Sequence, residues 1–213
     1  MTAVAALTVA PPGTAVEVRS IHDTQGVAVL RPIVTAAALI ETHKELTELV
    51  NTALVKDTDF GTIPGTKKPT LLKPGAERLC TAFGLRPEFD IIEQEIDHFR
   101  EVPWTKRQKQ WRNQFQGDRT FTWAEEAGTS QGFYRYVVRC RLLRRDTGDE
   151  VGQGVGSCST LESKYVDRPR ECENTALKIA KKRAHVDATL TTLGLSDRFT
   201  QDVEDTHGHA QPR

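Results

Sequence analysis

The stretch FYRYVVRCRLLRR at 133–145 constrains the fold of this chain more than any other. Its apolar and basic residues alternate, and successive side chains of a β-strand point to opposite faces of the sheet. We therefore expect one face to cover the core with Tyr134, Tyr136, Val138, Cys140 and Leu142. The other face carries four arginines: Arg135, Arg139, Arg141 and Arg145.

The segments on either side of this strand complete a recognisable order. A β-branched run at 89–99 predicts a strand before it, and a turn at 146–149 leads into a glycine-rich strand at 150–160. Apolar periodicity predicts helices over 36–54, 74–83 and 173–193. The fold class is α+β: a three-stranded antiparallel sheet (a β-β-β-α core) packed on a long C-terminal helix, with N-terminal helices and a basic hairpin insertion. The glycines of the third strand would leave one side bare for packing.

The 213 residues, 38% of them hydrophobic, are enough for one domain with flexible ends. We expect a flexible N-terminal arm over 1–30, a core over 31–198 and an acidic flexible tail over 199–213. No apolar stretch approaches the roughly 20 residues that span a bilayer. The chain thus carries no sign of a membrane segment.

Charge is balanced overall, with 29 basic and 29 acidic residues, but it is not evenly distributed. Residues 100–145 contain 11 basic and 4 acidic side chains, a local net charge of +7. The connection at 100–132 interleaves these cations with indoles: Lys106, Arg107, Lys109, Arg112, Trp104 and Trp111. Basic groups hold phosphates and aromatic rings stack on bases, which favours a single-stranded nucleic acid. The alternative is an ordinary solvated hairpin with one or two Trp in the core.

Arginines two residues apart on a strand stand roughly 6.6 Å from each other, so this face could follow a phosphate backbone. Alternatively, they pair with Glu93, Glu95 or Asp97 of a neighbouring strand. The last helix adds a further basic group: Lys178, Lys181, Lys182 and Arg183. Such a run is often only the solvated side of a helix. Our hypothesis is that all these cations and indoles share one continuous side of the sheet.

Signals for enzymatic chemistry are weak. The spacing of GTIPGTKK at 61–68 differs from a phosphate-binding loop. Glu162 and Lys164 resemble half of a Mg²⁺-dependent nuclease site, which would need Asp149 or Glu95 as an acidic partner. Cys158, Cys172 and His185 lack the paired spacing of a zinc site, so four buried free thiols are expected instead. We predict no catalytic residue, no metal and no cofactor.

Two blocks carry a family resemblance: DFGTIPGTKKPTLLKPGAERLCTAFGL at 59–85, and GVGSCSTLESKY with the segment ENTALKIAKKRAHVDATLTTLGLSDRFTQDVED, within 154–205. With the strands between them, they resemble phage and bacterial recombination proteins of the Rad-fifty-two-like superfamily of single-strand annealing proteins. The pattern NTxLKxAKKRAxVDAxL in the final helix is the most specific part. Lys178, Lys181, Lys182 and Arg183 lie inside a matching block.

The resemblance implies an ATP-independent protein that binds single-stranded DNA and anneals complementary strands in recombination and repair. It implies a phage-encoded or prophage-derived chain in the cytoplasm of a bacterial host, assembled into a ring or helical homo-oligomer. The helix at 36–54 and the sheet edges are candidate protomer contacts. The acidic tail is a candidate docking site for a replication or recombination protein. The alternative is a module that binds single-stranded DNA or RNA without annealing.

Overall fold

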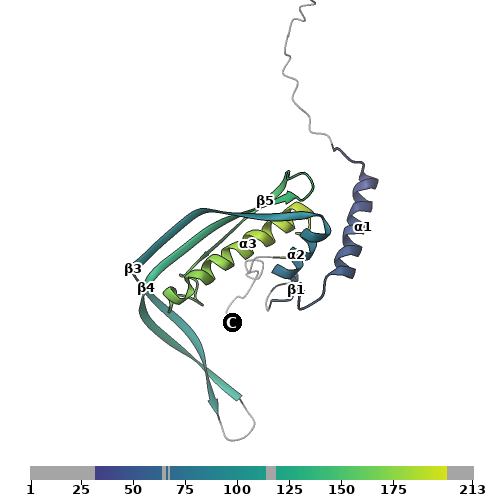
Figure 1. Ribbon diagram of the computed structural model, residues 1–213. Coiled ribbons are helices and arrows are strands. Elements are labelled where there is room, and N and C mark those ends of the chain that lie inside the picture. Colours follow the sequence, from purple (N-terminus) through teal and green to yellow (C-terminus); the bar gives the residue numbers. More distant parts are fainter. Residues whose placement is uncertain (1–31, 64–65, 67, 114–118, 201–213) are drawn as a thin grey trace, which may run out of the picture. The chain divides into compact units, whose positions relative to one another are not determined.

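The computed structural model describes residues 32–63, 66, 68–113 and 119–200, without the side chains at 108–113 and 119–121 (Figure 1). The chain divides into two compact units, Met1–His43 and Lys44–Arg213. Within the first unit, residues 32–43 are exposed and include the first turns of α1 (Ala36–Ala53). The expected flexible arm at 1–30 lies outside the described residues.

The second unit contains the predicted three-stranded antiparallel sheet, in the order β3 (Leu85–Asn113), β4 (Arg119–Arg144) and β5 (Glu150–Ser159). The expected turn joins β4 to β5, and Gly148 adopts a φ of 80° there. The alternation on β4 holds, because Tyr134, Val138 and Leu142 are all buried on the side that packs against α3. The predicted fold class is therefore confirmed.

The helix α3 (Glu173–Leu193) lies along this sheet and ends at Gly194 in the left-handed conformation. Its alanine stripe, Ala176, Ala180, Ala184 and Ala188, is completely buried. The stripe fits because β5 offers glycines: a Cβ on Gly154 would lie 2.2 Å from the Ala188 nitrogen. The helix backbone thus approaches the strand more closely than any side chain on β5 would allow.

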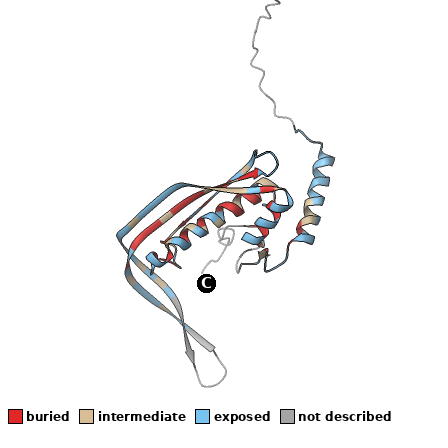
Figure 2. Cartoon of the chain, in the orientation of Figure 1, coloured by how far each residue is buried: buried red, intermediate tan, exposed pale blue. Residues whose placement is uncertain are grey.

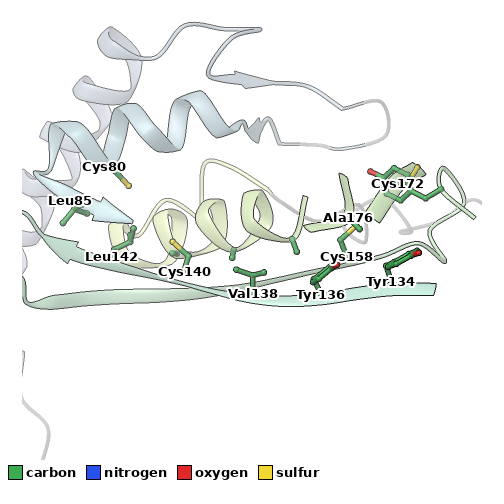
Figure 3. Packing of buried hydrophobic residues seen from close by; sticks show 14 residues of the cluster. Cys80, Leu85, Tyr134, Tyr136, Val138, Cys140, Leu142, Cys158, Cys172 and Ala176 are labelled. Atoms are coloured by element: carbon green, nitrogen blue, oxygen red, sulfur yellow. The ribbon is translucent and has the colours of Figure 1, made fainter. Parts of the chain in front are cut away.

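Two apolar clusters stabilise the second unit. The larger lies between the sheet and α3, where Cys140, Val138 and Tyr136 meet the alanine stripe (Figure 3). The smaller joins the end of α1 to the short elements β1 (Phe60–Gly61), β2 (Thr70–Leu71) and α2 (Lys73–Ala82), and to the C-terminal end of α3. Phe199 is buried in this second cluster. The core therefore extends at least to Thr200, beyond the predicted start of the tail at 199; residues 201–213 lie outside the description.

The connection at 100–132 is a long hairpin rather than an irregular loop. Its two strands pair from Glu101 opposite Gln131 to Asn113 opposite Arg119, continuing β3 and β4 beyond the N-terminal end of α3. The described side chains of this hairpin, at 101–107 and 122–131, are mostly exposed, whereas buried ones concentrate where α3 covers the sheet (Figure 2). The strands are thus longer than the sequence predicts. We call this extension the arm.

Within the described ranges, no helix is both long enough and apolar enough to cross a bilayer.

Candidate nucleic-acid interface

The outer face of the sheet, which points away from α3, carries the arginines of β4 in ion pairs with carboxylates of β3. Arg139 lies 3.3 Å from Asp90, directly across the strands. Arg141 lies 3.3 Å from Glu88 and 3.2 Å from Asp90. Arg135 pairs with Glu93. This is the alternative that the sequence left open, so the charge of these arginines is largely balanced within the fold.

Arg145, the fourth predicted arginine, lies just after the end of β4 and binds the start of β3. The Arg145 Nε donates a hydrogen bond to the carbonyl of Leu85 at 3.0 Å. Among the apolar residues that interrupt the arginines, Phe133 is buried and has the Arg100 guanidinium 4.4 Å above its ring centroid. The outer face is therefore a layer of arginine stems, apolar side chains and paired charges.

Two of the predicted arm residues hold the arm together. The Trp104 ring lies on the backbone of Gly128, its cross-strand partner, where a Cβ would come within 2.7 Å of the ring. Lys106 lies 5.9 Å from the centroid of this ring and 2.5 Å from the carboxylate of Asp167. Both side chains are thus engaged inside the protein. The side chains of Lys109, Trp111 and Arg112 lie outside the described set.

Other parts of the arm remain accessible. Arg107 is exposed and stands opposite Glu125 in the strand register. Trp123 is 61% exposed and lies beside these two residues in a shallow surface pocket. Trp123 is thus an accessible indole that the sequence reasoning did not assign to the site.

On α3, Arg183 is bound on the side of the helix next to β5. Its guanidinium lies 2.5 Å from Glu162 and 2.6 Å from the carbonyl of Ser157. The hydrogen bond with Glu162 is the main cause of a raised Arg183 pKa. Burial alone would raise the pKa of Glu162, but hydrogen bonds and the charges of Arg183 and Lys164 lower it to about 2.

This arrangement removes support for the nuclease alternative. Glu162 pairs with Arg183 and, at 3.3 Å, with Lys164. Both members of the motif are therefore engaged with each other. In addition, the described side chains include no group of three His, Cys, Asp or Glu residues that could hold a metal ion.

The four cysteines are buried, as predicted. Burial raises the pKa values of Cys140 and Cys158 to about 12, which disfavours the reactive thiolate. The Cys80 sulfur lies 3.4 Å from Nε2 of His185, and burial lowers the pKa of this histidine. These groups belong to the core packing between α2, α3 and the sheet.

The remaining lysines of α3 lie on the opposite side of the sheet from the arginines. Lys181 lies 5.5 Å from the ring centroid of Phe89, and the His185 ring meets Phe89 edge-on at 6.0 Å. This flank of the helix therefore faces β3. Lys178, one turn earlier on the same flank, is exposed, and within the described structure neither lysine forms an ion pair.

The strand β3 presents no carboxylate on this side between 89 and 98. Residues directly opposite each other in an antiparallel pair share a face. Ile91, Gln94 and Ile96 stand opposite the inward-facing Val138, Tyr136 and Tyr134. The acidic residues point to the outer face: Glu88, Asp90, Glu93, Glu95 and Asp97.

The helix covers β4 and β5 but leaves this side of β3 open. Ile91 is 45% exposed and Ile96 is 41% exposed, although both point to the side of the sheet that carries α3. We call the surface formed by Lys178, Lys181, Ile91, Gln94 and Ile96 the inner strip. It combines cations without carboxylate partners and accessible apolar side chains.

The expected single continuous basic side is wrong. The arginines of β4 and the lysines of α3 lie on opposite faces of the sheet, because the helix packs against the face that the arginines leave. Lys182 is half-buried on α3. Sequence reasoning also missed β3 as a contributor, since only the register shows which of its side chains lie beside α3.

A scan against protein-family models found no match to this chain, and neither did searches of curated proteins and of solved structures.

Proposed function

We propose that this chain is a single-stranded DNA-binding protein that anneals complementary strands without ATP, in recombination or repair in the cytoplasm of a bacterial host. The observation that carries the proposal is the inner strip. Its lysines form no ion pair within the described structure, and the inward-facing residues of β3 between 89 and 98 include accessible isoleucines and no carboxylate. The family resemblance of the final helix supports the annealing step.

Charge explains why the inner strip fits a polyanion better than the outer face does. A phosphate that approaches Arg139 or Arg141 must compete with Asp90 at 3.2–3.3 Å. A phosphate that approaches Lys178 or Lys181 displaces only water and mobile counterions. Counterion release then drives binding and makes it strongly dependent on salt.

The apolar half of the strip suits bases rather than phosphates. Ile91 and Ile96 offer contact surface without directional hydrogen-bond groups, so binding should show little preference for sequence. Bases that rest loosely on such a surface keep their pairing edges available to a second strand. This is the property that annealing requires.

Two lysines per chain bind a strand weakly, so the proposal includes a homo-oligomer that repeats the strip along the DNA. Linking sites multiplies affinity without any new contact. The edge of the sheet formed by β5 is not available for this assembly over its central residues, because side chains of α3 bind the backbone of Val155 and Ser157 there. The exposed first half of α1 and the outer edge of β3 remain the candidate protomer contacts.

The proposal is tested with Lys178→Ala/Lys181→Ala and a labelled oligo(dT) in a fluorescence anisotropy titration at several salt concentrations. The matched control is Lys56→Ala/Lys68→Ala, which removes the same charge from exposed positions elsewhere. We expect the first variant to bind at least about 10-fold more weakly. Its log Kd should depend less on log salt, by roughly 0.7 for each phosphate that the variant no longer binds. Equal binding by both variants would refute the proposal.

Annealing is tested separately from binding. Complementary oligonucleotides with a quenched fluorophore pair should form duplex faster with the protein, in the absence of nucleotide. If the protein binds single strands but leaves the pairing rate unchanged, the non-annealing alternative is correct.

A further inference from the structure

The junction between the sheet and the arm is a built feature of the fold. Asp97 stands opposite Phe133, and the next pair is Glu101 opposite Gln131. Three residues of β3 therefore face a single residue of β4, Gly132, whose φ of 110° is unfavourable for any other residue type. Bulges of this kind redirect a strand and the side chains it carries. We call residues 98–100 the elbow.

Asp97 fixes the backbone of the elbow. Its Oδ1 accepts hydrogen bonds from the backbone N–H groups of Phe99 and Arg100, each at 3.0 Å. The first of these bonds is the main cause of the lowered Asp97 pKa. Arg100 in turn lies 2.7 Å from Glu95. The chain on both sides of Phe99 is thus held in place.

Phe99 itself contributes little to the fold. Its side chain is 77% exposed, more than any other described aromatic residue. An apolar ring on a rigid backbone and in contact with water is ready to bind a flat partner without loss of backbone entropy.

A cation also binds the backbone of the elbow. The Arg170 Nη2 donates hydrogen bonds to the carbonyl of His98 at 2.9 Å and to Oε1 of Gln131 at 2.6 Å. Glu171 is its acidic neighbour along the chain and Glu101 is its acidic neighbour across the elbow, yet within the described structure Arg170 forms no ion pair. Its remaining N–H groups and its charge are available to an anion.

The elbow also adjoins the inner strip. Nδ1 of His98 lies 2.9 Å from the hydroxyl of Tyr134. Tyr134 is the cross-strand partner of Ile96, the last apolar residue of the strip. A strand that runs along the inner strip toward the arm therefore reaches the elbow.

We infer that the elbow is a nucleotide-binding step, in which Phe99 stacks on one base of the single strand and Arg170 binds an adjacent phosphate. The inference rests on the proposed function, because the strand must first occupy the inner strip. The elbow carries an exposed aromatic ring and, on its backbone, a guanidinium that forms no ion pair within the described structure, and these two groups match the base and the phosphate of a nucleotide. The elbow would fix the register of the strand where the sheet ends.

The test uses Phe99→Ala, Phe99→Trp and Arg170→Ala with labelled oligo(dT), and Phe83→Ala as a control that removes another exposed phenyl ring. We expect Phe99→Ala to weaken binding by about 5-fold or more, and Phe99→Trp to restore it. Phe99→Ala should leave the slope of log Kd against log salt concentration unchanged. Arg170→Ala should reduce this slope by roughly 0.7, because one phosphate contact is lost.

An abasic oligonucleotide distinguishes base stacking by Phe99 from a purely structural role of this residue. If Phe99 stacks on a base, the weakening caused by Phe99→Ala should disappear with the abasic strand. An equal weakening with the normal and the abasic strand would overturn the inference. A change in oligomer mass without a change in DNA affinity would also overturn it, and would assign Phe99 to a protomer contact. If Lys178→Ala/Lys181→Ala weakens binding and Phe99→Ala does not, only the elbow is refuted. If neither does, the proposed function fails as well.

Discussion

The carboxylate of Asp187 on α3 accepts a hydrogen bond from the backbone N–H of Val155 at 2.8 Å, so the helix covers the outer edge of β5. Two residues further along, the carbonyl of Ser157 accepts a hydrogen bond from Arg183. An uncovered edge strand is a template for another chain. The helix therefore covers the edge of β5 with the side chains of Asp187 and Arg183, while its alanine stripe packs against the inner face of the sheet.

Asp187→Ala should uncover the edge of β5. We expect a decrease of about 1–2 kcal/mol in unfolding free energy, because a charged acceptor is removed from a backbone donor. Self-association should increase, which light scattering after size-exclusion chromatography would detect. Glu171→Ala, which removes an exposed carboxylate elsewhere, should change neither quantity. A variant that keeps both the stability and the mass of the wild type would contradict this role for Asp187.

Gly154→Ala should destabilise the fold by about 1–3 kcal/mol or more, because overpacking must push the helix away from the sheet. The added Cβ would lie 2.2 Å from the nitrogen of Ala188. Gly61→Ala is the matched control, since its nearest neighbour would be 4.0 Å away. Urea unfolding followed by circular dichroism compares the two. Similar midpoints for both variants would show that the close approach is not required.

The ion pair of Glu162 predicts a dependence of stability on pH. Its pKa is lowered from 4.5 to about 2 in the folded protein, so the folded state favours the charged form. The resulting stabilisation is present above pH 4.5 and is lost as the pH falls from about 4.5 to about 2. Glu162→Gln should flatten that part of the curve of unfolding free energy against pH, whereas Glu171→Gln should not. An unchanged slope in Glu162→Gln would argue against the pair.

The two faces of the sheet are expected to differ in DNA binding. Arg139→Ala/Arg141→Ala should change the oligo(dT) affinity by no more than about 2-fold, since these arginines are balanced by Asp90 and Glu88. Lys178→Ala/Lys181→Ala removes the same charge from the inner strip and should have the larger effect. The opposite order would move the interface to the outer face.

Much of the fold could be predicted because its signals are local. Alternation on β4 identified the buried residues from Tyr134 to Leu142, and Gly194 marked the end of α3. The glycines of β5 indicated a close approach, although only the structure identified Ala188 and Ala184 as the neighbours.

The site was harder to predict because it depends on register between distant segments. The sequence offered Glu93, Glu95 and Asp97 as partners for the β4 arginines. Only Glu93 pairs with one of them; Glu95, although it stands opposite Arg135, and Asp97 pair with Arg100 instead. Arg170 lies in a segment without a periodic pattern, so nothing local indicated its position at the elbow. The strand predicted to end at 99 continues beyond the elbow because the arm resumes the same ladder.

The most direct test of the inner strip is amine footprinting of the wild-type protein by mass spectrometry, with and without saturating oligo(dT). Lys178 and Lys181 should lose reactivity when DNA is bound, while Lys56 and Lys68 should react equally in both samples. Unchanged labelling of Lys178 and Lys181 at saturation would contradict the account.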